Sequence, residues 1–182
     1  YTSSIGLVFL AVGLTLGQPN NDLTMTENAT GSYVVEAVVD KINQECIFDD
    51  DAFIVRRIAY VETYDGFDPR TFERDGQPYF GGIWQVDEPH FDNTKTATEF
   101  FADIQMHFGI NWTTAVWQNL RIPMYSGIAS RIVIHQIAPG APTDPVIPRS
   151  VKDQAKLWAE KYQLVSNDTT SKAIEYVDKV ET

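Results

Sequence analysis

The sequence predicts one mainly helical domain (α+β), in which several helices surround a helix that ends in a glutamate, and a small β element follows that helix. Three observations support this prediction. Apolar residues recur at helical spacing in separate segments, a stretch rich in Gly, Pro and Asp interrupts them between residues 65 and 82, and 43% of the 182 residues are hydrophobic. A chain of this length and composition can bury one core, so we expect a single domain over residues 32–165.

The first 31 residues are expected to precede this domain. An uncharged apolar run from Ile5 to Leu16 is too short to span a bilayer and ends beside small residues, which predicts a secretory signal peptide over residues 1–17, truncated at its start. A buried N-terminal strand or helix is the alternative. Residues 18–31 are polar and have no periodicity, which predicts a flexible N-terminus.

The first predicted helix covers residues 33–46, with Ser32 as its N-cap. Its apolar side chains lie three and four positions apart, which is typical of the buried face of a helix. These core positions are Val34, Val35, Val38, Val39 and Ile42.

The second predicted helix runs from about residue 53 to residue 62 and follows three aspartates, Asp49-Asp50-Asp51. Free amides and the helix dipole attract negative charge at a helix N-terminus, so we interpret the aspartates as capping residues. A calcium loop is the alternative, although the spacing of its ligands is missing.

The chain after this helix is predicted to be irregular and then helical again. Residues 65–82 should form a loop or short hairpin, and residues 79–87 should form a strand after a turn at Gly81-Gly82. Further helical patterns cover residues 97–108, 113–120 and 124–136, and a last helix with Ser150 as its N-cap runs to about residue 162. A Pro-rich loop covers residues 139–148. Residues 166–182 are expected to be a C-terminal tail, either a short helix or disordered.

Composition restricts the partners of the protein. The net charge of -11 argues against nucleic acid, because binding to phosphates needs a basic surface. Asn-x-Ser/Thr sequons at Asn28, Asn111 and Asn167 fit a secreted, extracellular glycoprotein.

The single cysteine, Cys46, is interpreted as a small buried hydrophobe or as an intermolecular thiol. No membrane association is expected after removal of the signal peptide, and nothing in the composition sets the oligomeric state.

Glu62 is the candidate catalytic acid. It lies near the C-terminal end of the second helix, with apolar neighbours at Ile58 and Val61. Burial and the helix dipole both disfavour a charged carboxylate there, so the pKa of Glu62 should be raised, as proton donation to a glycosidic oxygen requires. A solvated glutamate at a helix end is the alternative.

A second carboxylate is available on the predicted strand. Glycoside hydrolysis needs a base or nucleophile beside the acid, and Asp87 can supply it, while Asp75 in the preceding loop is a further candidate to position water. Gln85 can contact a sugar from the same strand. Trp84 can either stack on a sugar ring or belong to the core, and the residues favour neither.

Together these residues resemble the goose-type lysozymes and the related lytic transglycosylases. The resemblance rests on Glu62, on Gly82-Ile83-Trp84-Gln85-Val86-Asp87 and on His90, and it covers about residues 50–137. In that family the glutamate at the helix end is the catalytic acid, and a Gly-Leu-Met-Gln-like strand follows it. The resemblance therefore implies a lysozyme-like fold, with Glu62 as the general acid and with Asp87 or, second, Asp75 holding the attacking water in an inverting reaction.

The chain departs from the family pattern in two places. Residues 134–140 lack the tyrosine of the family's Tyr-Asn-Ala-Gly motif, and Trp84 replaces the usual Met or Leu. Tyr125 is the candidate to replace the missing tyrosine, and Tyr64 and His90 complete the expected substrate-binding residues.

The activity that the resemblance implies is that of a secreted glycosidase, a muramidase that cleaves β-1,4-linked N-acetylhexosamine polymers such as peptidoglycan or chitin. The alternative is a catalytically inactive, extracellular glycan-binding or matrix protein, and a fold reused for an unrelated function is a third class. No metal or cofactor is expected, since His90, His107 and His135 lie far apart and show no metal-ligand spacing.

Overall fold

The computed structural model describes residues 22–141, 144–163 and 169–181. Over these residues the protein is mainly helical, with seven α-helices and one two-stranded antiparallel sheet, as the sequence predicts. The segment expected to be a signal peptide, residues 1–17, lies outside the described residues. Within the described ranges, every helix is too short or too polar to cross a membrane.

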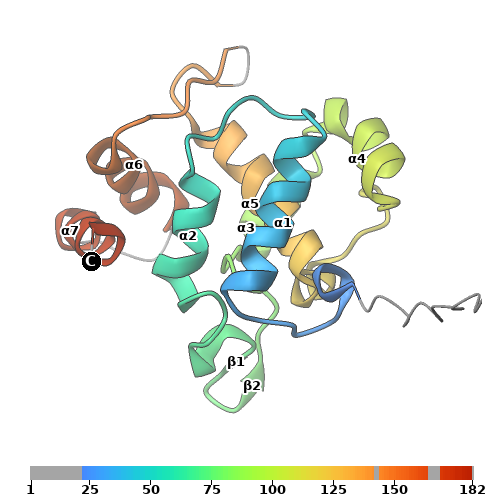
Figure 1. The fold of residues 1–182 in the computed structure, drawn as a ribbon, viewed down its shortest axis with the longest axis horizontal. Helices are drawn as coiled ribbons and strands as arrows, with labels where there is room; N and C mark the ends of the chain where they lie inside the picture. The colour runs from blue at the N-terminus through green and yellow to red at the C-terminus, as the bar shows by residue number, and fades with distance from the viewer. Residues whose placement is uncertain (1–21, 142–143, 164–168, 182) are drawn as a thin grey trace, which may run out of the picture.

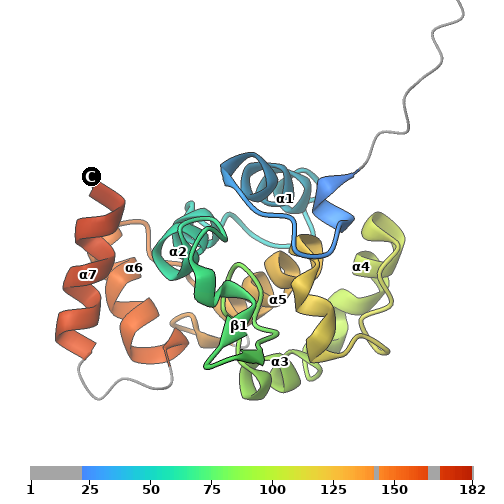
Figure 2. The same cartoon turned by 90° about the horizontal axis from the view of Figure 1, so that it is seen from below.

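Three helices form the centre of the molecule: α1 (Ser32–Gln44), α2 (Ile54–Thr63) and α5 (Pro123–Ile137). All three contact one another, and Figure 2 shows α1 and α2 on one side of α5 with α3 on the other. Gly127 lets α1 approach α5 closely, because a Cβ at this position would lie 2.4 Å from Cγ1 of Val38. The apolar face predicted for the first helix is confirmed, since all five of its residues are buried.

The other elements surround this centre. They are α3 (Glu88–Thr94), α4 (Phe101–Phe108), α6 (Val151–Leu157), the π-helix η5 (Trp158–Tyr162) and α7 (Thr169–Glu181), with four short 3-10 helices, η1 (Leu23–Met25), η2 (Pro69–Thr71), η3 (Thr98–Phe100) and η4 (Trp117–Arg121). Figure 1 shows α6 and α7 side by side along α2. Tyr176 of α7 is fully buried, with its ring centroid 5.4 Å from that of Trp158. The C-terminal segment is therefore a packed helix over residues 169–181.

Helix starts were predicted with mixed success. The aspartate cap of α2 is confirmed, because Oδ1 of Asp51 accepts a hydrogen bond from the Phe53 amide at 2.9 Å and Oδ2 accepts one from the Val55 amide at 3.3 Å. Ser32, in contrast, is the first residue of α1 and not its cap. Gly31 occupies the cap position with a φ of 107°, which a residue with a side chain adopts at a cost.

The strand predicted over residues 79–87 is wrong. The small sheet lies earlier in the chain, where β1 (Glu73–Arg74) pairs with β2 (Gln77–Pro78). Residues 81–86 form successive turns instead, because Gly82 and Gln85 have φ values of 64° and 52°. The apolar residues that suggested a strand are used for burial, since Ile83, Trp84 and Val86 point into the core.

Two other segments also differ from the expectation. Residues 113–120 form a turn and then the 3-10 helix η4, not an α-helix. Residues 22–31, expected to belong to a flexible N-terminus, contact the domain: the side chain of Thr24 is buried, and the Asn28 amide donates to the Arg121 carbonyl at 2.8 Å. Local composition did not indicate these tertiary contacts.

Candidate active site

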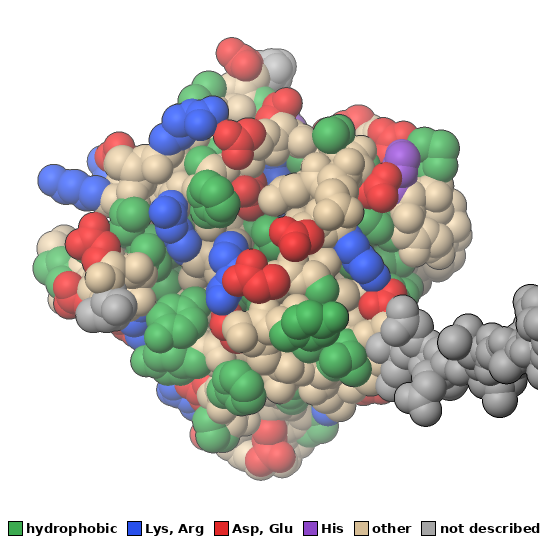
Figure 3. All heavy atoms as spheres, viewed as in Figure 1, with side chains coloured by type: hydrophobic (Ala, Val, Ile, Leu, Met, Phe, Trp, Pro, Cys, Tyr) green, Lys and Arg blue, Asp and Glu red, His purple; other side chains and the backbone are tan. Residues whose placement is uncertain are grey.

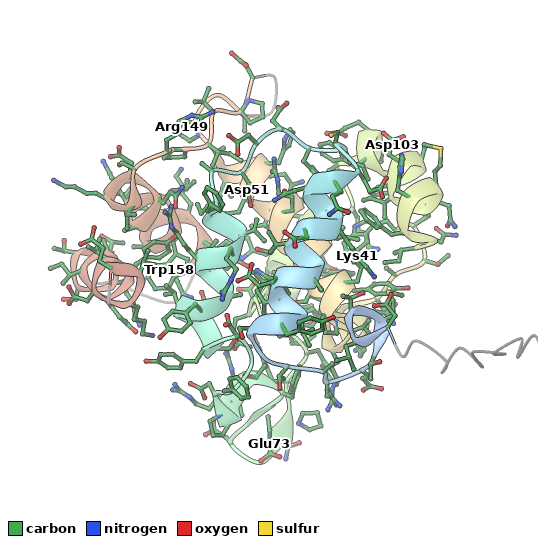
Figure 4. The ribbon with its side chains drawn as sticks, viewed as in Figure 1. Lys41, Asp51, Glu73, Asp103, Arg149 and Trp158 are labelled. Carbon is green, nitrogen blue, oxygen red and sulfur yellow. The ribbon has the colours of Figure 1, made fainter. Side chains whose placement is uncertain are left out.

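A polar pocket of about 620 Å³ lies at the C-terminal end of α2. Its walls come from three segments that are distant in sequence: the end of α2, the loop and hairpin that follow it, and the C-terminal helices. Figure 4 shows Trp158 between α2 and the C-terminal helices, and Glu73 on the hairpin below them. The fold thus brings side chains from residues 61–85, 158–163 and 172–179 together around one space.

The end of α2 is anchored to the turn that follows the hairpin. Thr63 is buried, and its hydroxyl donates to the Ile83 carbonyl at 2.8 Å and accepts from the Gly66 amide at 2.9 Å. Tyr64 ends the helix in the left-handed conformation, with a φ of 51°. These contacts hold the last turn of α2, and with it Glu62, in a defined position against residues 82–85.

Glu62 is half-buried in the wall of this pocket. Its Oε1 accepts hydrogen bonds from Nε1 of Trp158 at 2.8 Å and from Nε2 of Gln163. Burial raises the pKa of Glu62 from its ordinary value of 4.5 to about 7, against the opposing effect of these two hydrogen bonds and of the charges on Lys172 and Lys179. The predicted increase in pKa is confirmed, and a carboxyl group of this kind can donate a proton near neutral pH.

The loop and hairpin side of the pocket carries two more carboxylates. Hydrogen bonds from Arg70 lower the pKa of Asp68 to about 2, so this carboxylate is ionised and already paired. Asp75 is exposed at the turn between the two strands, with a φ of 52°. Of these two, Asp75 is therefore the carboxylate that is better placed to interact with water or a ligand in the pocket.

Arg74 and Gln85 form a polar contact in the same wall. The guanidinium group of Arg74 donates to Oε1 of Gln85 and lies 3.6 Å from the centre of the Tyr79 ring. Nε2 of Gln85 donates to the Gly82 carbonyl at 2.6 Å and to the Thr71 carbonyl at 3.1 Å. The amide of Gln85 is thus fixed by the loop. Gln85 lines the pocket, and its contact with a ligand remains a prediction.

The C-terminal helix α7 closes the remaining side with charged residues. Glu175 bridges Lys172 and Lys179, at 2.9 and 3.0 Å, and Nζ of Lys179 also donates to the Val61 carbonyl at 2.8 Å. The pocket is lined by four acidic and four basic side chains: Glu62, Asp68, Asp75, Glu175, Arg70, Arg74, Lys172 and Lys179. Figure 3 likewise shows both signs of charge interspersed over this face of the molecule.

Asp87 and His90 lie outside this pocket. Asp87 caps α3: its Oδ1 accepts from the His90 amide and pairs with Nδ1 of His90, both at 2.9 Å. Burial alone would raise the pKa of Asp87, but the contacts with His90 hold it below its usual value. Its charge nevertheless acts on the hydroxyls of Tyr79 and Tyr162, which also feel the charge of Glu62. The predicted catalytic role of Asp87 remains a prediction.

Trp84 is a core residue, so its expected contact with a sugar is corrected. Its side chain has 0% exposure, and Nε1 donates to the Val55 carbonyl at 2.8 Å. A ring without accessible surface cannot stack on a ligand.

Tyr125 packs against Trp112, with ring centroids 6.2 Å apart, and lies outside the pocket. Tyr64, in contrast, is 44% exposed and lines the pocket, as its predicted role requires.

The remaining predicted positions lie on the surface. The side chains of Asn28 and Asn111 are exposed, as glycosylation requires, whereas Asn167 lies outside the described residues. Cys46 is exposed, so its interpretation as a buried hydrophobe is wrong, and the intermolecular thiol remains a prediction. Within residues 22–141, 144–163 and 169–181, the structure has no group of three His, Cys, Asp or Glu side chains that could hold a metal ion.

The C-terminal part of the pocket was missed from the sequence. Trp158 belongs to the core, with 2% exposure, but its indole nitrogen points at Glu62. Gln163 and the charged residues of α7 carry no motif. The sequence signal for this part of the pocket was the helical spacing of Tyr176 and its apolar neighbours. This spacing predicts a packed helix, but it does not show which residues the helix packs against.

Comparison with protein-family models, with curated proteins and with solved structures finds no match for this chain.

Proposed function

We propose that the protein is a secreted glycoside hydrolase with a lysozyme-like fold, which cleaves β-1,4-linked N-acetylhexosamine polymers such as peptidoglycan or chitin. The observation that carries the proposal is the carboxyl group of Glu62, which has a pKa of about 7 and lines a polar pocket. A mainly helical chain with a small hairpin after the glutamate helix agrees with this fold class.

In the proposed reaction Glu62 is the general acid. It transfers its proton to the glycosidic oxygen as the bond from that oxygen to the anomeric carbon breaks. A water molecule attacks the anomeric carbon from the opposite face and gives its proton to Asp75, which is exposed in the same pocket. Hydrogen bonds from Trp158 and Gln163 hold the Glu62 carboxyl in one orientation, while Oε2 takes neither of these bonds.

One observation favours a second candidate function, an inactive glycan-binding protein. The two hydrogen bonds to Oε1 of Glu62 stabilise the ionised carboxylate, and so they oppose the protonated state that an acid needs. The missing tyrosine motif points in the same direction. In this case the pocket would bind a saccharide without cleaving it.

The test is the release of reducing ends from purified peptidoglycan and from chitin oligosaccharides between pH 4 and pH 8. We expect activity that the Glu62→Gln variant loses by about a hundredfold or more, because the reaction then lacks its proton donor. Turnover that persists in Glu62→Gln would refute the role of Glu62. Binding of the same oligosaccharides without turnover would support the second candidate, and neither binding nor turnover would refute both.

The same assay separates the two carboxylates that could hold the water. Asp75→Asn should reduce turnover more than Asp87→Asn, because Asp75 lies in the pocket and Asp87 caps α3. NMR detection of the first anomer released would show whether the configuration is inverted.

Secretion can be tested by expression in a eukaryotic secretory host, followed by removal of N-linked glycans and mutation of Asn28 and Asn111.

A further inference from the structure

A second, shallower pocket of about 450 Å³ lies beside the first. Tyr60 and Tyr64 of α2 form one wall, and residues of α7 form the other. Tyr64, Glu175 and Lys179 line both pockets, so the two spaces are adjacent and share these residues as a common wall. We call this second pocket the aromatic groove; its lining is completed by Ser171, Ile174 and Asp178.

The aromatic groove presents ring surface to solvent. Tyr60 and Tyr64 are 39% and 44% exposed, and their ring centroids lie 5.5 Å apart at an angle of 86°. Tyr60 lies on α2 and Tyr64 is the residue that ends it, and this edge-to-face contact places both rings on the same side of the helix end. Ile174 adds an aliphatic side chain that is 56% exposed. Figure 3 shows exposed hydrophobic side chains over the lower part of α2 on this face.

Polar groups lie beside these apolar surfaces. Lys179 has its Nζ 4.8 Å from the centre of the Tyr64 ring and pairs with Glu175, which also pairs with Lys172. Ser171 and Asp178 add a hydroxyl and a carboxylate. A pyranose ring has a matching surface: its C–H face packs on aromatic rings, and its hydroxyl groups form hydrogen bonds at its edge.

We propose that the aromatic groove is an accessory saccharide-binding subsite, which holds sugar units of a polymer whose cleaved bond lies at Glu62. This inference rests on the proposed function and extends it to the length of the substrate. A chain of sugars is the expected occupant because the groove adjoins the Glu62 pocket across Tyr64, Glu175 and Lys179. The paired charges of Lys179 and Glu175 favour a neutral ligand over a strongly charged one.

The subsite predicts a dependence on oligosaccharide length. A disaccharide bound at Glu62 would not reach the groove, whereas a hexasaccharide would occupy both. Loss of one stacking ring should therefore weaken binding of the longer ligand only. Tyr60 is the residue to change, because Tyr64 also lines the Glu62 pocket and ends α2.

The experiment measures binding of N-acetylglucosamine disaccharide and hexasaccharide by calorimetry, in the Glu62→Gln background so that no ligand is cleaved. Tyr60→Ala should weaken hexasaccharide binding about tenfold, as expected for the loss of one aromatic contact, and leave disaccharide binding unchanged. Tyr60→Phe should restore it, since the ring is kept. Tyr33→Ala is the matched control, because Tyr33 is 76% exposed on α1 and lies outside both pockets.

The outcomes separate the two proposals. If the hexasaccharide binds and Tyr60→Ala has no larger effect than Tyr33→Ala, the subsite is refuted and the proposed function stands. Equal weakening of both ligands by Tyr60→Ala would also refute the subsite, since it would place the effect at Glu62. If the wild-type protein neither binds nor cleaves the hexasaccharide or soluble peptidoglycan strands, the proposed function fails and the subsite fails with it.

Discussion

Replacement of Glu62 by Gln should make the protein more stable at alkaline pH while it removes activity. The glutamine keeps the shape of the side chain, and its Oε1 can still accept the hydrogen bonds from Trp158 and Gln163. The side chain at position 62 can no longer ionise in this variant. The substitution therefore isolates the free energy that the folded protein loses when a half-buried carboxyl group becomes charged.

The magnitude follows from the pKa of Glu62. In the folded state it is raised from 4.5 to about 7, so between these values the folded protein holds a proton that the unfolded chain has released. Stability is thus fully present below pH 4.5 and falls as the pH rises to about 7. At about 1.4 kcal/mol per pKa unit, the loss amounts to about 3 kcal/mol in the free energy of unfolding.

The assay is urea denaturation of the wild type and of Glu62→Gln at pH 4, 5, 6, 7 and 8. The free energy of unfolding of the variant minus that of the wild type should increase by about 3 kcal/mol over this range, because all other titrating groups cancel in the difference. Glu73→Gln, at an exposed position on β1 outside the pocket, is the matched control for the loss of one carboxyl group. A difference for Glu62→Gln that does not change with pH would refute the raised pKa and with it the proton-donor argument.

Three further substitutions test other parts of the structure. Trp158→Phe removes one donor that stabilises charged Glu62, so the pKa of Glu62 should increase further and the alkaline limit of activity should move to higher pH, as a pH–rate profile would show. Gly82→Ala would place a Cβ 2.1 Å from the Leu120 carbonyl oxygen, at a φ of 64°. It should lower the free energy of unfolding by about 2 kcal/mol or more, as measured by thermal unfolding, and an unchanged melting temperature would contradict this packing. Tyr176→Phe removes a buried hydroxyl that has no hydrogen-bond partner within the described residues. The free energy of unfolding should stay unchanged or increase, whereas a clear decrease would indicate that the hydroxyl has a hydrogen-bond partner.

Helical periodicity was a reliable guide where one face of a helix is buried. The apolar face of α1, the aspartate cap of α2 and the Ser150 cap of α6, whose hydroxyl accepts from the Asp153 amide at 3.1 Å, are local features that the order of residues reveals. The failure over residues 79–87 has a local cause too. Apolar and aromatic residues were interpreted as a strand, although Gln85 adopts a positive φ that its residue type does not signal.

The sequence by itself determined the mainly helical class, the position of Glu62 near a helix end and the irregular segment that follows it. These are properties of neighbouring residues, because periodicity, capping and turn composition act over a few positions. Only the tertiary structure decided what surrounds the Glu62 carboxyl group. Trp158 and Gln163 reach it from about a hundred residues further along the chain, α7 covers its side, and Trp84 is withdrawn into the core. Burial and hydrogen bonding set the pKa of a carboxyl group, and both depend on contacts between distant segments, which no local pattern specifies.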